Sequence, residues 1–242
     1  EALDLLKGAS FSDVVWRGAP YQERFEGALK ERLIHKYKAY FASRNVEQAF
    51  TDLNTFHILC ALRVGPYGAI AVNRMIEDMC RKAGFLDRDG RWYTGRPVMV
   101  TENDYHLRLF NGDVGVAYPD DDAGGELRIH FPKEGGLFRK LHPGRLSAFE
   151  TVYAMTVHKS QGSEFDHVLL MLPDSYSGVV TRELIYTALT RARKTVEIWG
   201  TEEVFAEALS QATNRQSGLR EALLADRRTT TGENPAAPLS DC

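Results

Sequence analysis

Short apolar runs alternate with helical patterns in this chain, and the alternation is interrupted once by a stretch of different texture. Residues 56–62 are predicted to form a buried strand, and a helix over about 70–82 follows it and ends at Gly84. The pattern resumes with strands predicted at 152–157, 168–172 and 196–199 and a helix at 181–192. Strands that alternate with helices indicate an α/β fold built on a parallel sheet.

Two helical segments have a recognisable apolar face. Residues 21–50 are predicted as one long amphipathic helix whose buried stripe consists of Phe25, Leu29, Leu33, Tyr37 and Tyr40. The inner side of the helix at 70–82 is expected to consist of Ala71, Met75, Ile76 and Met79. A last helical segment is predicted at about 202–225, and the polar tail at 227–242 is expected to be disordered.

The interrupting stretch runs from about residue 92 to residue 150. Short β-like runs at 97–101, 114–118 and 127–131 are separated by frequent turn sequences. Strands this short, with turns this frequent, predict a small β-barrel inserted into the α/β domain. The stretch carries basic residues but also three consecutive acids and few aromatics, so a platform on which bases stack is not established by the sequence.

Composition limits the function classes. A net charge of −3 and a pI near 6.2 argue against a generic basic nucleic-acid binder, so any DNA contact must come from local geometry. No apolar stretch approaches the roughly 20 residues that a membrane span needs. The three cysteines have no zinc-binding spacing and suggest a reducing compartment, with Cys60 and Cys80 as core thiols and no metal site. The chain starts at Glu1 rather than Met, which we interpret as part of a longer protein.

A polar segment at 156–164 follows one predicted strand and precedes another. Ligands of parallel sheets bind at the carboxyl ends of strands, where small polar side chains leave room for them. Gly162 allows close backbone approach, and Glu164 can accept hydrogen bonds from a ribose hydroxyl. Thr156 and His158 can donate to phosphate oxygens of a nucleic-acid strand. A polar turn with a helix cap explains this segment equally well on its own.

A second segment, at 186–193, adds two arginines near the end of the predicted helix at 181–192. Thr181 is a natural N-cap with Glu183 in the first turn, and the helix dipole favours cations at the other end. Arg191 and Arg193 therefore stabilise the helix end in one interpretation. In the other, an arginine acts as a finger that stabilises charge on a transferring γ-phosphate. The chain contains no Gly-Lys dipeptide and hence no phosphate-binding loop of its own.

The first segment resembles motif V of superfamily 1 helicases, and the second resembles their motif VI. Five strings in family order are similar to the RecD family, the α subunits of exodeoxyribonuclease V (RecBCD), over roughly residues 55–225. These strings lie at residues 58–68, 92–99, 109–115, 154–166 and 179–184. The resemblance implies an ATP-dependent DNA helicase that moves 5′ to 3′ on single-stranded DNA. It also implies assembly with RecB and RecC in double-strand-break repair and recombination, and a cytoplasmic, bacterial location.

The resemblance further implies a RecA-like fold of the P-loop NTPase type, in which a parallel sheet has helices on both faces and an Src-homology-3-like β-barrel is inserted. Residues 1–94 would be the first part of the second RecA-like motor domain, 95–148 the barrel, 149–226 the rest of that domain, and 227–242 a disordered tail. ATP and Mg²⁺ would be bound mainly by a first domain that lies outside this chain, so the chain alone is expected to be inactive.

Carried over by position, Gly162 and Glu164 would contact nucleotide, Arg191 would be the catalytic γ-phosphate sensor, and Thr156 and His158 would contact the DNA backbone. Many superfamily members have lysine where Gln161 stands, which puts a charged contact there in doubt. Arg63 and Asn73 are weaker DNA-binding candidates, and Arg63 could equally pair with an acid. A second hypothesis is a non-catalytic nucleic-acid- or protein-binding module that retains motor motifs.

Overall fold

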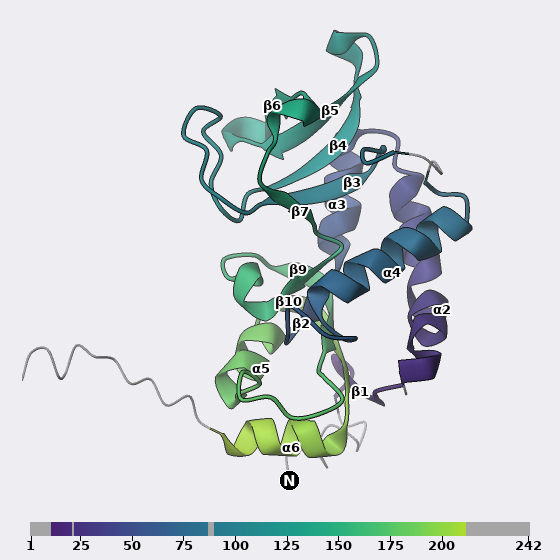
Figure 1. The fold of residues 1–242 in the computed structure, drawn as a ribbon, viewed down its shortest axis with the longest axis vertical. Coiled ribbons are helices and arrows are strands. Elements are labelled where there is room, and N and C mark those ends of the chain that lie inside the picture. The colour runs from purple at the N-terminus through teal and green to yellow at the C-terminus, as the bar shows by residue number, and fades with distance from the viewer. Residues whose placement is uncertain (1–10, 21, 87–89, 212–242) are drawn as a thin grey trace, which may run out of the picture. The chain divides into compact units, whose positions relative to one another are not determined.

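The computed structural model describes residues 11–20, 22–86 and 90–211, which build two separate five-stranded sheets (Figure 1). The first sheet is parallel throughout. Its strand order is β1 (Val14–Gly18), β10 (Ala192–Gly200), β9 (Phe165–Met171), β2 (Phe56–Cys60) and β8 (Ala154–Thr156). The predicted α/β fold with a parallel sheet is therefore confirmed, although the strand expected at 152–157 is only three residues long.

Helices cover both faces of this sheet. One face carries α2 (Gln22–Phe41), α3 (Val46–Thr55) and α4 (Ala69–Lys82), and the other carries α5 (Arg182–Leu189) and α6 (Glu202–Ser210). Side chains alternate along a strand, so Ile58 and Cys60 of β2 join the core under the first three helices, whereas Leu59 joins the core under α5 and α6. Two apolar layers thus sandwich one buried sheet.

The helix predicted at 21–50 is wrong in one respect, because it is two helices. The stripe from Phe25 to Tyr40 is buried as predicted, but α2 ends at Phe41 and α3 begins at Val46. Asn45 starts the new helix, since its side chain accepts a 2.9 Å hydrogen bond from the backbone N–H of Gln48. A side-chain cap of this kind competes with helix continuation and separates the two segments.

The helix α4 agrees with its predicted span, but its inner face is rotated. The buried residues are Ala69, Val72, Asn73, Ile76, Met79 and Cys80, whereas Ala71 and Met75 are only half-buried. The turn before α4 requires Gly68. A Cβ atom at this position would lie 2.5 Å from the carbonyl carbon and oxygen of Val64, which are backbone atoms that cannot move aside.

The second sheet is antiparallel and lies between β2 and β8 in the chain. Its order is β6 (Phe138–Leu141), β5 (Glu126–Pro132), β4 (Val114–Asp120), β3 (Arg96–Val100) and β7 (Phe149–Thr151). It has a small core of its own, which includes Val98, Ile129 and Phe131. The three predicted strands are confirmed and two more are present. Among the described residues no ladder joins β6 to β7, so closure into an Src-homology-3-like barrel stays a prediction, as do the domain boundaries at 94 and 148.

The end of the described chain departs from the sequence prediction. The helix expected at 181–192 ends at Leu189, and β10 starts at Ala192, four residues before the strand expected at 196–199. The helix α6 ends at Ser210, so the remainder of the segment predicted at 202–225 and the tail at 227–242 lie outside the described residues. No helix in the described ranges has the length and apolar character to cross a membrane.

Candidate functional site

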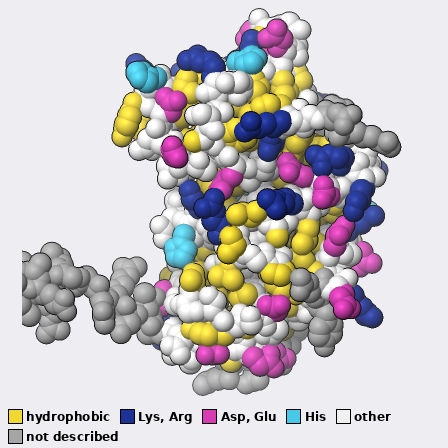
Figure 2. All heavy atoms as spheres, in the orientation of Figure 1, with side chains coloured by type: hydrophobic (Ala, Val, Ile, Leu, Met, Phe, Trp, Pro, Cys, Tyr) yellow, Lys and Arg dark blue, Asp and Glu magenta, His cyan; other side chains and the backbone are white. Residues whose placement is uncertain are grey.

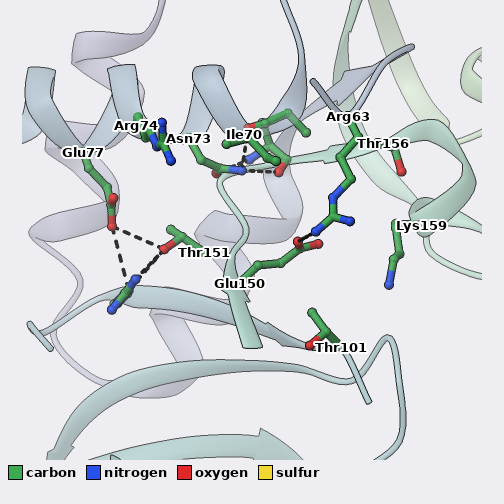
Figure 3. Close-up of a pocket in the computed structure, with 13 residues that line it drawn as sticks. Arg63, Ile70, Asn73, Arg74, Glu77, Thr101, Glu150, Thr151, Thr156 and Lys159 are labelled. Carbon is green, nitrogen blue, oxygen red and sulfur yellow. Dashed lines mark hydrogen bonds and ion pairs between the residues drawn. The ribbon is translucent and has the colours of Figure 1, made fainter. Parts of the chain in front are cut away.

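The carboxyl ends of β2 and β8 meet at one edge of the parallel sheet, where Cys60 is in register with Thr156. A pocket of about 390 Å³ opens at this edge, between α4, the end of β8 and the second sheet (Figure 3). Arg63 follows β2, Thr156 ends β8, and Lys159 belongs to the 3-10 helix η4 (Val157–Ser160), and all three line the pocket. The location is the one expected for a ligand of a parallel sheet.

Four cationic side chains line this pocket, together with two carboxylates. The cations are Arg63, Arg74, Arg96 and Lys159, and the acids are Glu77 and Glu150. Figure 2 shows basic side chains gathered over the region between the two sheets. A cationic surface of this kind, in a chain of net charge −3, is a local attraction for anions rather than a property of the whole protein.

Arg63 does pair with an acid, as the sequence left open, but that acid is not a neighbour in sequence. Its Nη2 atom lies 3.2 Å from Oε2 of Glu150, a residue of β7 in the second sheet (Figure 3). The side chain of Arg63 remains 67% exposed. An exposed ion pair is worth little energetically, so the guanidinium can exchange Glu150 for another anion.

Asn73 lies at the pocket wall, but its amide is engaged with the protein. Nδ2 donates to the carbonyl oxygens of Ala69, at 2.9 Å, and Ala154, at 2.7 Å, and Oδ1 accepts from the N–H of Ala154 at 2.9 Å. The amide therefore pairs with β8 as a neighbouring strand would, on the open edge of the sheet. This arrangement makes Asn73 an anchor of the strand that carries Thr156.

A hydrogen-bonded network joins α4 to both chain segments that enter and leave the second sheet. The Glu77 carboxylate accepts a 2.6 Å bond from the Tyr93 hydroxyl and a 3.3 Å bond from Thr151. Arg96 donates to the Thr151 hydroxyl at 2.7 Å, and the Tyr153 hydroxyl donates to that of Tyr93 at 3.1 Å. Burial, reinforced by the charge of Glu77, raises the pKa of Tyr93 far above its usual value, so this phenol stays protonated.

The segment 156–164 begins at this pocket. Thr156 is half-buried and His158 is exposed, so both are accessible to a ligand. Ser160 is buried, and its hydroxyl donates to the carbonyl oxygen of Val157 at 2.7 Å, which holds the turn in shape. Lys159 reaches across to the second sheet, where its Nζ donates to Oδ1 of Asn111 at 2.9 Å. Nothing local in the sequence signals this bond, because its partner lies 48 positions away.

The other end of this segment contacts Arg191. The guanidinium of Arg191 donates to the carbonyl oxygen of Ser163 at 3.1 Å and, through Nε, to that of Thr187 at 3.3 Å. Gly162 has a φ of 85°, a left-handed conformation that favours glycine, and a Cβ atom there would meet nothing within 4 Å. The two sequence motifs are therefore in direct contact, beside an open surface at Gly162.

Glu164 and Arg193 form an ion pair with Nε and Oε2 3.1 Å apart. Their side chains are 54% and 59% exposed, so the pair is weak and either group can exchange it for a ligand. Arg191 directly follows Thr190, the C-cap of α5, so it lies near the helix end as expected. The expectation is wrong for Arg193, which lies in β10. Helix-dipole stabilisation therefore does not explain Arg193.

Cys60 and Cys80 are core thiols, as predicted. Cys60 and Cys80 are buried, and burial raises the pKa of the Cys60 thiol well above its usual value. Burial, with the charge of Glu77, also raises the pKa of Cys80 to about 12. Within the part of the chain that the structure describes, no group of three or more His, Cys, Asp or Glu side chains could hold a metal ion.

Comparisons with known proteins place these features in context. Residues 151–198 match the family model of the UvrD-like helicase C-terminal domain. The RecBCD enzyme subunit RecD of Mycolicibacterium smegmatis is 40% identical over 176 residues, which cover 73% of this chain and 30% of that protein. The ATP-dependent RecD2 DNA helicase of Deinococcus radiodurans is 32% identical over 172 residues, covering 70% of this chain and 23% of that protein.

Among solved structures, a Bacteroides Pif1 helicase in complex with ADP-AlF3 and ssDNA is similar at 13% identity and a TM-score of 0.41. The alignment covers 90% of this chain and 56% of the Pif1 chain. The region shared with the RecD relatives spans less than a third of their length.

Proposed function

Since this chain belongs to the RecD family of superfamily 1 DNA helicases, we propose that it is the second motor domain of an ATP-driven translocase on single-stranded DNA. One observation carries the proposal. The segment 156–164 joins a cationic pocket at its first residues to Arg191 at its last, so a change at one end is transmitted to the other. A translocase needs such a connection between its ATP site and its DNA-binding site.

On the nucleotide side, the chain supplies one wall of a composite ATP site. It has no phosphate-binding loop, so the triphosphate and Mg²⁺ are held mainly by another RecA-like domain of the full-length protein. Gly162 leaves room for the nucleotide, and Glu164 accepts hydrogen bonds from its ribose. Arg191 reaches the γ-phosphate, whose charge attracts a guanidinium more strongly than the neutral carbonyls of Ser163 and Thr187 do.

On the DNA side, the pocket at the ends of β2 and β8 binds the phosphates of a single strand. Thr156 and His158 donate hydrogen bonds, and Arg63 and Lys159 supply charge once they release Glu150 and Asn111. Asn73 contributes indirectly, because its amide fixes β8 and hence the position of Thr156.

Closure of the two domains over ATP couples the two sides. When Arg191 turns to the γ-phosphate, it releases the carbonyl oxygen of Ser163 and the segment 156–164 shifts. The shift moves the Thr156 and Lys159 contacts along the strand, and hydrolysis reverses it. Charge stabilisation by an arginine finger in other phosphoryl-transfer enzymes is worth ~10³–10⁵ in rate.

The full-length protein is proposed to move 5′ to 3′ and to assemble with RecB and RecC in double-strand-break repair. The name of the M. smegmatis relative, a RecBCD enzyme subunit, supports this part of the proposal. These assignments follow from the family and not from any contact in the described residues.

The test is the substitution Arg191→Ala in the full-length protein. We expect DNA-stimulated ATP hydrolysis to fall by at least ~10²-fold while equilibrium binding of an ATP analogue is retained, because a finger acts on the transition state. Arg182→Ala, an exposed arginine at the start of α5, is the matched control and should retain hydrolysis within a few-fold. Near-wild-type turnover of the Arg191→Ala protein would reduce Arg191 to a structural contact of the Ser163 loop.

A further inference from the structure

The loop between β3 and β4, residues 101–113, exposes two aromatic rings on the inserted sheet. Tyr105 is 74% exposed and Phe110 is 51% exposed, whereas Leu109 of the same loop and Phe131 of β5 are buried. The two ring centroids are 6.3 Å apart and the rings stand at 81° to each other. Two exposed rings at nearly a right angle form a corner. The loop projects from the margin of the sheet, where Figure 2 shows apolar and histidine side chains together.

The loop that carries this corner is held rigidly by its own side chains. Asp104 and Leu109 exchange both backbone hydrogen bonds, at 2.8 and 2.9 Å, and the Asp104 carboxylate also accepts from the N–H of Leu107. Asn103 accepts from the N–H of Asn111, and Asp113 accepts from that of Phe110, each at 2.8 Å. The backbone that carries the two rings is thus held in one conformation before any ligand arrives, which lowers the ordering entropy of binding.

A cation also braces the loop in an unusual backbone conformation. Arg139 of β6 donates to the carbonyl oxygens of Leu107 and Arg108. Arg108 has a φ of 48°, which is uncommon for a residue other than glycine. This conformation reverses the chain between Tyr105 and Phe110 and brings their rings together.

The loop that carries the corner contacts the cationic pocket near both of its ends. Thr101, at the start of the loop, lines that pocket, and Asn111, next to Phe110, accepts the hydrogen bond from Lys159. Arg108 and His106 of the loop are exposed, as is Glu102, so the surroundings of the rings are charged and polar rather than apolar. Two rings flanked by polar groups beside a phosphate-binding pocket suit a base of a nucleic-acid strand better than an apolar protein surface.

We propose that Tyr105 and Phe110 form a stacking corner for one unpaired base of the strand whose phosphates occupy the Arg63–Lys159 pocket. The proposal rests on the proposed function, because it takes single-stranded DNA as the ligand. One ring stacks on the face of the base and the other contacts its edge, so the contact is indifferent to sequence. This stacking contact adds an attraction that does not depend on salt to the attraction between the pocket and the phosphates.

The test compares single strands with and without bases, using the full-length protein and its Tyr105→Ala/Phe110→Ala variant. Stacking of one base on aromatic side chains corresponds to roughly 5- to 150-fold in affinity. We therefore expect the variant to bind an oligothymidylate at least ~5-fold more weakly than wild type. Both proteins should bind an all-abasic strand of the same length equally, because only the phosphates remain. Equal affinity of the two proteins for the oligothymidylate would overturn the proposal.

Salt dependence separates this proposal from the proposed function. The logarithm of the DNA-binding constant falls linearly with the logarithm of salt concentration, and each lost phosphate contact makes this fall less steep by about 0.7 for single strands. Lys159→Met should therefore reduce the steepness, and the double variant should leave it unchanged. If Lys159→Met and Arg63→Gln change neither slope nor affinity, the phosphate pocket is wrong. If they do, but the double variant binds like wild type, only the stacking corner is wrong.

Two controls exclude structural explanations. Leu137→Ala removes another exposed apolar side chain of the inserted sheet, 67% exposed, and should leave DNA affinity unchanged. Tyr105→Phe keeps the ring and should retain wild-type affinity. A double variant that binds DNA normally but no longer assembles with its partner subunits would show that the corner contacts protein, and this outcome also overturns the proposal.

Discussion

Asn73 offers the sharpest test of how the site is built, because its amide forms three hydrogen bonds and all of them are internal. The substitution Asn73→Ala leaves the N–H and the carbonyl of Ala154 without their partner. Ala154 is 2% exposed, and an unpaired buried polar group costs about 1–3 kcal/mol. The upper end of that range does not apply here, because Asn73 and Ala154 both line the pocket and water can enter the space left behind.

The magnitude follows from these contacts. Two backbone groups at about 1–1.5 kcal/mol each give about 2–3 kcal/mol. Alanine is the better helix former in α4 by about 0.7 kcal/mol or less, which offsets part of the loss. We therefore expect Asn73→Ala to lower the free energy of unfolding by about 2 kcal/mol in urea denaturation. Hydrogen exchange should show the Ala154 amide losing protection more than the amides of β9 do.

Asn54→Ala is the matched control for this experiment. Asn54 lies in α3 and is exposed, so the same change there should leave the free energy of unfolding nearly unaltered. A loss below about 1 kcal/mol for Asn73→Ala, with Ala154 still protected, would refute the anchoring role. Weakened DNA binding without any loss of stability would instead support the direct DNA contact that the sequence suggested for Asn73.

Two further outcomes are expected. Glu197 is buried, which alone would raise its pKa, but hydrogen bonds from Arg32 and Trp199 and the charge of Arg17 lower it overall. Its charged form therefore stabilises the fold above the ordinary value near pH 4.5, and the contribution is lost as pH falls through the lowered folded-state pKa. Because Arg17 and Arg32 are 59% and 40% exposed, Glu197→Gln should destabilise by only about 1 kcal/mol at neutral pH. The difference between the free energies of unfolding of wild type and Glu197→Gln, measured by urea denaturation, should become smaller below pH 4.5. A difference that stays constant down to pH 3 would contradict this prediction. Separately, the thiols of Cys60 and Cys80 should react with a thiol reagent only after denaturation, as followed by mass spectrometry, because burial raises both pKa values.

The sequence predicted those features of the fold that depend on neighbouring residues. The parallel strands, the stripe of α2 and the Thr181 cap of α5 each arise from a local pattern, and each is present. The break between α2 and α3 was missed because the periodic pattern alone does not distinguish a capping residue such as Asn45 from a polar residue within a helix. The start of β10 at Ala192 was missed because its first residues, Arg193 and Lys194, are polar and exposed.

Contacts between distant segments set the limit of prediction for the site. The segments 156–164 and 186–193 were each recognisable, but their direct contact through Arg191 and Ser163 emerges only in three dimensions. The pairs Arg63–Glu150 and Lys159–Asn111 join residues that are 87 and 48 positions apart. Each pair links a segment next to the parallel sheet with the inserted antiparallel sheet or its β3–β4 loop. No local pattern could have assigned them, and they give the pocket its second wall.

The polar network around Glu77 determines how the inserted sheet can move. Both of its connections to the rest of the chain, through Tyr93 and through Thr151, are fastened to the same carboxylate of α4. Because the inserted sheet is hydrogen-bonded to one helix at two points, we expect it to follow a displacement of α4 more closely than a single attachment would allow. Any such displacement would also carry the loop of Tyr105 and Phe110 with it.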